Sequence, residues 1–183
     1  MRPSDVLLNE VLTPERLTGI VDVGANPVDG EPPYQQMLTK GLCTVIGFEP
    51  QPEQLASLER RKGPHEIYLP YVVGDGHEHV LHVAQASGMT SLLPPDPARL
   101  ALFNGFLGWG TVLARIPTPT VRLDDISEVV RIDLLKIDIQ GAELMVFQNG
   151  RDRLRHAVAA CRSAQPRCAR PPPFTATDGA PRG

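Results

Sequence analysis

The stretch GIVDVGAN, residues 19–26, begins the pattern that places this chain in a fold class. Residues 19–23 form a short apolar run that predicts a buried strand, and Gly24 marks the turn at its end. A strand that ends in an acid and then a glycine presents backbone N–H groups at the carboxyl edge of a sheet, where ligands bind in open α/β folds. Any strand-to-loop turn can use a glycine, however, so the stretch alone does not establish a site.

Segments of strand pattern and helix pattern alternate outward from this stretch. The alternation predicts an α/β fold, a Rossmann-like parallel sheet with helices on its faces. The expected strands are 43–48, 67–73, 80–84 and 132–139. The expected helices are 33–40, 52–61, 98–106 and 142–148, and 151–159 reads as a helix or as a helix leading into a strand.

A second motif, Gly47-Phe48-Glu49-Pro50, follows about one βαβ unit later. A carboxylate at the end of the second strand can accept two hydrogen bonds from ribose hydroxyls, and we expect Glu49 at an open rim. An exposed strand-end glutamate with no ligand is the alternative. Dinucleotide sites use G-x-G-x-x-G so that the chain approaches a pyrophosphate, but Asn26 stands where the second glycine belongs. The two motifs therefore favour a nucleoside ligand without a pyrophosphate over NAD.

A third motif is LLKIDIQGAE, residues 134–143. In a strand, Lys136 and Asp138 share a face, with Asp138 near the ligand edge. Asp138 is the candidate catalytic residue, because a carboxylate there can orient a substrate hydroxyl or accept its proton. A structural Lys–Asp pair beside a glutamate favoured by the helix dipole explains the same residues equally well.

Together the three motifs resemble the FkbM family of S-adenosylmethionine-dependent methyltransferases, in order and in spacing. The segments GMTSL at 88–92 and VRLDD at 121–125 are similar to signatures that the family has between them. The resemblance covers about residues 19–159. It implies S-adenosylmethionine as the cofactor and, as the reaction, O-methylation of a small molecule or a sugar hydroxyl.

The resemblance also implies roles for individual residues. Asp22, Gly24 and Asn26 would hold the methionine part of the cofactor, Glu49 its ribose, and Asp75 would approach the adenine. Three residues next to these in the sequence complete the expected cofactor-binding set: Ala25, Pro50 and Gly74. Ser91 is the expected substrate contact.

The chain departs from the family pattern near its end. We expect a methyltransferase domain over 1–160 that lacks its C-terminal strands, followed by a Pro/Arg-rich tail over 161–183. A further strand should begin near 158–160, but a truncated or frame-shifted reading frame would give the composition found from 161 onward. Without that strand, 132–139 would have an open edge that invites self-association. Residues 166–183 are expected to be disordered, because they have too few apolar side chains.

Composition narrows the range of partners, compartments and metals that the protein could have. The net charge is −3 with no block of Lys or Arg, which disfavours nucleic acid and membrane partners. Three cysteines without paired spacing and the lack of a signal peptide indicate a cytoplasmic protein. The His77–His82 run and the two late cysteines lack metal-ligand spacing, so no metal is expected. The expected partner is a small-molecule acceptor.

Two other functions stay open on the sequence. An NAD-binding oxidoreductase would use the same sheet edge, but the missing glycines oppose it. A non-catalytic remnant of a methyltransferase is favoured by the aberrant C-terminal segment.

Overall fold

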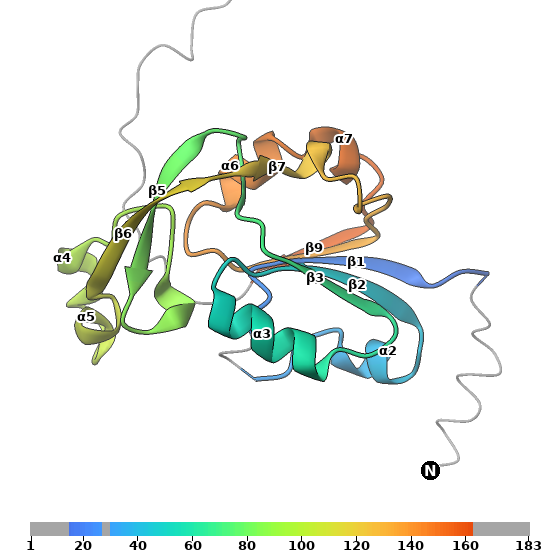
Figure 1. Ribbon diagram of the computed structural model, residues 1–183, viewed down its shortest axis with the longest axis horizontal. Helices are drawn as coiled ribbons and strands as arrows, with labels where there is room; N and C mark the ends of the chain where they lie inside the picture. Colours follow the sequence, from blue (N-terminus) through green and yellow to red (C-terminus); the bar gives the residue numbers. More distant parts are fainter. Residues whose placement is uncertain (1–14, 27–29, 163–183) are drawn as a thin grey trace, which may run out of the picture.

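The computed structural model describes residues 15–26 and 30–162, arranged around a parallel sheet (Figure 1). The expected tail, 161–183, lies almost wholly outside these residues. The five strands of the sheet are β1 Thr18–Val23, β2 Cys43–Phe48, β3 Glu66–Leu69, β8 Leu134–Ile137 and β9 Ala159–Arg162. Their order is β3-β2-β1-β8-β9 and every neighbouring pair is parallel. This is the predicted α/β sheet of Rossmann-like form.

Helices cover both faces of the sheet (Figure 1). One face carries α2, Gln35–Thr39, and α3, Pro52–Arg61; the other carries α6, Glu143–Gln148, and α7, Arg151–Leu154. The sequence explains α3 well. Pro52 occupies its first turn, where no N–H is needed, and Arg60 and Arg61 lie in its last turn, where cations complement the helix dipole. The predicted bounds of β2 and α3 are confirmed.

The core lies mainly between the sheet and α6. Successive residues of β1 point to opposite faces, so Val21 and Val23 face α6, whereas Ile20 packs with Tyr34 on the α2 side. The largest cluster of buried side chains comprises Val21, Val23, Phe48, Val73, Leu123, Ile126, Val129, Ile132, Leu135, Ile137 and Val146. Because all central strands are covered on both faces, they read as continuous apolar runs.

A two-stranded antiparallel ribbon projects from the sheet (Figure 1). It pairs β5, Glu78–Ala84, with β6, Val112–Pro119. The short helices α4, Pro97–Leu100, and α5, Phe106–Trp109, and the 3₁₀ turn η1, Ser87–Met89, lie between the two strands in sequence. The second small sheet joins β4, Val73–Gly74, to β7, Val121–Arg122, which leads into the 3₁₀ turn η2, Leu123–Asp125.

The main differences from the prediction are a divided helix, strands shorter than expected (the 132–139 strand is β8, Leu134–Ile137) and a strand that was not predicted. The single helix over 98–106 is wrong: α4 and α5 are separate, and Gly105 between them has a left-handed φ of 83°. The strand over 67–73 is also too long, because β3 ends at Leu69, directly before Pro70, which cannot donate a ladder hydrogen bond. Strand β6 was not predicted, since its prolines at 117 and 119 and its exposed side chains hide any alternation.

The edge of the sheet also differs from expectation. A strand does form after α7, and β9 pairs with β8 in the register Leu134↔Ala159. The expected open edge on the 132–139 strand is therefore wrong: β8 is an interior strand, and among the described residues β9 is the edge strand on that side. The sequence obscured β9 because it is short and begins with two alanines.

Within 15–26 and 30–162, no helix has the length and apolar character needed to cross a lipid bilayer.

Asp133 joins the segments that lead into β1 and β8. Its Oδ2 accepts hydrogen bonds from Arg16 Nη1 at 2.6 Å and from the Gly19 backbone N–H at 2.9 Å. Its Oδ1 accepts from Arg131 Nε at 2.8 Å and from Arg16 Nη2 at 3.0 Å. The Arg16 guanidinium is the main reason that the pKa of Asp133 lies well below its usual range. The carboxylate thus fixes the register at the start of both strands.

We predict that Asp133→Asn lowers the melting temperature at pH 7. A depressed carboxyl pKa contributes stability above the unfolded value of about 3.9, and that contribution is lost as pH falls toward the folded pKa. The difference between wild type and variant should therefore shrink below about pH 4. Thermal melts from pH 7 to pH 3 measure this difference in melting temperature. The control is Glu59→Gln, which changes a carboxylate in the exposed Glu59–Lys62 pair. A difference that does not depend on pH would contradict this role.

Candidate functional site

A cavity opens at the carboxyl ends of β1, β2 and β8. The chain runs from β1 outward to β2 and β3 and then returns to β8 on the other side of β1. The loops after β1 and β8 therefore leave in different directions, which creates a crevice at this switch point. The cavity is lined by Val23, Gly24, Asn26, Phe48, Glu49, Pro50, Gln51, Tyr71, Val72, Val73, Leu81, Ser87, Gly88, Thr90, Ser91, Leu92, Asp138 and Ile139. We call it the first cavity.

Gly24 is required where β1 meets β8. It has a left-handed φ of 80°, and a Cβ there would lie 2.2 Å from the Asp138 carbonyl oxygen. No L side chain fits so close to a backbone oxygen. The N–H groups of Gly24 and Ala25 both donate to the carbonyl of Phe48, at 3.1 and 3.0 Å. The loop after β1 is therefore held by backbone contacts to both neighbouring strands.

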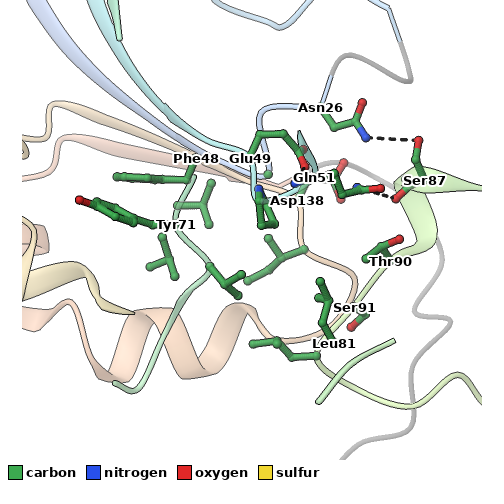
Figure 2. A pocket seen from close by; sticks show the side chains of 18 residues that line it. Asn26, Phe48, Glu49, Gln51, Tyr71, Leu81, Ser87, Thr90, Ser91 and Asp138 are labelled. Atoms are coloured by element: carbon green, nitrogen blue, oxygen red, sulfur yellow. Dashed lines mark hydrogen bonds between the residues drawn. The ribbon is translucent and has the colours of Figure 1, made fainter. Parts of the chain in front are cut away.

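The two ends of the first cavity differ in chemistry (Figure 2). Phe48 and Tyr71 form an apolar end, with their rings stacked at 6.3 Å between centroids. Polar side chains of Asn26, Gln51 and Ser87 gather at the other end. An aromatic wall beside a few placed polar groups is the usual composition of a site for a nucleoside-sized molecule.

Glu49 lies in this cavity as a buried carboxylate, with 2% of its surface exposed. The expected open rim is therefore wrong. Burial raises the pKa of Glu49, and the hydrogen bond from the Gln51 backbone N–H to Oε1, 2.8 Å long, opposes that rise in part. A buried carboxylate that faces a cavity forms strong hydrogen bonds with ligand hydroxyls, because little water competes.

Two side-chain hydrogen bonds connect the strand loops to η1 across the polar end of the cavity (Figure 2). Asn26 Nδ2 donates to Ser87 Oγ at 3.3 Å, and Gln51 Nε2 donates to the Ser87 carbonyl at 3.4 Å. Asn26 Oδ1 is buried and has no hydrogen-bond partner within the described part of the chain. The loops after β1 and β2 and the ribbon thus meet at Ser87.

Asp22 faces a second cavity on the α2 side of the sheet. Its Oδ1 forms an ion pair with Lys136 Nζ at 2.9 Å, and its Oδ2 accepts from the Tyr34 hydroxyl at 2.5 Å. Burial raises the pKa of Asp22, and Lys136 and Tyr34 act against that rise. Lys136 Nζ also donates to the Gly24 carbonyl at 2.7 Å. In this structure Asp22 supports the loop after β1 through Lys136.

Asp138 and Asn26 line both cavities. The Asp138 backbone N–H donates to the Val23 carbonyl at 2.9 Å, and its Oδ1 accepts from Gln140 Nε2 at 3.3 Å. The candidate catalytic carboxylate therefore stands at the boundary between the cavities. Ala25 lines only the second cavity and Pro50 only the first.

The remaining predicted residues have structural partners. Ser91 lines the first cavity, but its hydroxyl donates to the Gln140 carbonyl at 3.2 Å and accepts from the Leu93 N–H at 3.0 Å. Gly74 and Asp75 line neither of the two cavities. Burial acts to raise the pKa of Asp75, but the His77 N–H and the His79 ring outweigh it, so the pKa is lowered. The predicted adenine contact of Asp75 and substrate contact of Ser91 stay predictions.

Sequence reasoning missed several residues at the cavity. Gln51 directly follows the second motif, and Ser87 directly precedes GMTSL, so both lay beside a signal that was recognised. Tyr71 reaches the cavity from the segment between β3 and β4, and its ring stacks with Phe48. Tyr34, which binds Asp22, lies outside every motif. Its role depends on how α2 packs, which no local pattern records.

A comparison of the sequence with known protein families finds a match that covers the residues of the first cavity. The model of the methyltransferase FkbM domain matches residues 22–163, which include the end of β1, all of β2 and β8, and the residues that line the first cavity. No match is found among curated proteins or among solved structures.

We predict that Lys136→Met destabilises the protein by about 3–5 kcal/mol near pH 8, because it leaves Asp22 as an uncompensated buried charge. Since burial already raises the pKa of Asp22, protonation at lower pH should relieve part of this loss. Chemical denaturation at pH 8 and pH 5 measures the loss in the free energy of unfolding at each pH. The double variant Asp22→Asn/Lys136→Met, which removes both charges, should be more stable at pH 8 than the single variant. An equal loss at both pH values would contradict the charge explanation.

Proposed function

Because the chain belongs to the FkbM family of methyltransferases, we propose that it binds S-adenosylmethionine in the first cavity and methylates a hydroxyl group. The acceptor would be a small molecule or a sugar. The observation that carries this proposal is the buried Glu49 carboxylate, which lines the same cavity as the apolar Phe48–Tyr71 end.

The residues present suit this cofactor. Gly24 lets the loop after β1 approach the Asp138 carbonyl, where a Cβ would lie 2.2 Å from the oxygen, so the strand ends at the cavity stay close together. Glu49 offers acceptors for two ribose hydroxyls, and Asn26 Oδ1 is a buried acceptor that needs a donor. S-adenosylmethionine has no phosphate, which agrees with Asn26 in the place of a pyrophosphate-binding glycine.

The cofactor, when bound, supplies a methyl group already activated on a sulfonium. The chain then contributes mainly alignment, which can be worth several kcal/mol. Asp138 is the proposed general base: it lines both cavities, so it can meet an acceptor hydroxyl beside the cofactor site. The backbone hydrogen bond from Asp138 to Val23 keeps the residue fixed at the end of β8.

The proposal also includes the compartment and the partners of the protein. We place it in the cytoplasm, with a small-molecule acceptor and without nucleic acid or membrane partners. Self-association would use β9, the edge strand beside β8 among the described residues. Unpaired N–H and C=O groups on an edge strand can pair with another copy.

We predict that the protein binds S-adenosylhomocysteine more tightly than NAD. Glu49 serves the ribose of either ligand, but Asn26 replaces the glycine that a pyrophosphate requires. Calorimetric titration of the full chain with each ligand measures the preference. Tighter binding of NAD would overturn the methyltransferase proposal, and binding of neither ligand would favour a non-catalytic remnant.

We predict that Glu49→Gln weakens S-adenosylhomocysteine binding by about 1.5–3 kcal/mol, the scale of a hydrogen bond to a charged group. Stability near pH 8 should not fall, because the raised pKa of Glu49 shows that its charge is unfavourable in the folded state. Glu53→Gln, at an exposed glutamate in the first turn of α3, is the matched control. Unchanged affinity together with lower stability would assign Glu49 to structure alone.

A further inference from the structure

Ser87 is the residue on which three segments of the first cavity converge (Figure 2). It begins η1, between β5 and the helices of the ribbon. Its hydroxyl accepts from Asn26, which follows β1, and its carbonyl accepts from Gln51, which follows β2. No motif in the sequence assigns Ser87 a role, although its side chain lines the cavity.

The contact with Ser87 uses one polar atom of the Asn26 amide and leaves the other available. Nδ2 donates to Ser87 Oγ, so Oδ1 is the other polar end of the amide. Oδ1 is buried and meets no donor among the residues that the structure describes. A buried acceptor without a donor is costly, and such a group in a cavity points to a donor on the ligand.

The charges around Asn26 favour a cationic donor. Glu49 lines the same cavity, and the charge of Asp22 lies close enough to contribute to the raised pKa of Glu49. The nearby cation, Lys136, already contacts Asp22 and the Gly24 carbonyl. An ammonium group would be attracted to these carboxylates, whereas a ligand carboxylate beside Asn26 would be repelled.

We propose that Ser87 is a positioning residue: it orients the Asn26 amide so that Oδ1 accepts a hydrogen bond from the α-ammonium group of the bound ligand. This inference rests on the proposed function, because S-adenosylmethionine carries such a group. The Gln51 contact joins the Ser87 backbone to the loop after β2, so both side chains that contact Ser87 come from loops at the strand ends.

The test compares two ligands that share adenosine and a thioether. S-adenosylhomocysteine carries the amino-acid group, and 5′-methylthioadenosine lacks it. In calorimetric titrations of the full chain, Ser87→Ala should weaken S-adenosylhomocysteine binding about 3- to 10-fold, and Asn26→Leu about 10-fold or more. Neither variant should change the affinity for 5′-methylthioadenosine.

Asn26→Asp separates an ammonium partner from a carboxylate partner. Its carboxylate keeps an acceptor for an ammonium group and can still accept from the Ser87 hydroxyl, so S-adenosylhomocysteine should bind at least as tightly as to wild type. If Nδ2 instead donated to the ligand carboxylate, Asn26→Asp would weaken binding as much as Asn26→Leu. That result would overturn the inference.

Coupling and controls complete the experiment. Ser87 acts through Asn26, so the double variant Ser87→Ala/Asn26→Leu should bind no more weakly than Asn26→Leu alone. Ser127→Ala, at an exposed serine that contacts only Glu128 in the described structure, should change nothing. Glu49→Gln should weaken both ligands alike, because both contain ribose. Circular dichroism and melting temperature confirm that each variant is folded.

The outcomes distinguish the two proposals. If wild type binds neither ligand, the proposed function is wrong and this inference falls with it. If wild type binds S-adenosylhomocysteine but the Ser87 and Asn26 variants change both ligands equally, or change neither, only the inference is overturned.

Discussion

The ammonium group of Lys136 joins the two strands between which the site lies. It reaches from β8 to the Asp22 carboxylate on β1 and to the Gly24 carbonyl directly after β1, so it neutralises a buried charge and also fixes the loop after β1. Two buried charges cost desolvation energy that their attraction repays only when the geometry is good and other hydrogen bonds are satisfied. The Tyr34 hydroxyl supplies the second partner that Asp22 needs.

The first cavity follows from this arrangement. With the Gly24 loop held against β8 by Lys136 and against β2 by backbone hydrogen bonds, the carboxyl ends of three strands are fixed relative to one another. Glu49 and Asp138 are the residues directly after two of those strands. Their positions therefore depend on the sheet and not on a flexible loop, which is the placement that a binding or catalytic carboxylate requires.

The parts of the fold and of the candidate site that could be predicted from the sequence are those marked by patterns of neighbouring residues. An apolar run and a proline in the first helical turn identify β2 and α3, and the strand-end motifs identify Gly24, Glu49 and Asp138 as neighbours. Contacts made across the fold leave no such pattern. Tyr34 and Ser87 matter because of what α2 and η1 pack against, and β6 was missed because its prolines and exposed side chains resemble a loop.

The two sides of the first cavity are held by hydrogen bonds of different length. On the sheet side, Gly24 and Ala25 donate backbone hydrogen bonds of 3.1 and 3.0 Å, and the Gly24 carbonyl accepts from Lys136 Nζ at 2.7 Å. On the ribbon side, Ser87 is joined to the strand loops by side-chain hydrogen bonds of 3.3 and 3.4 Å, which are long for N–H donors. Displacing η1 costs less than moving the sheet edge. The sheet side thus provides a fixed template for the ligand, and the ribbon side is where the cavity can adjust to it.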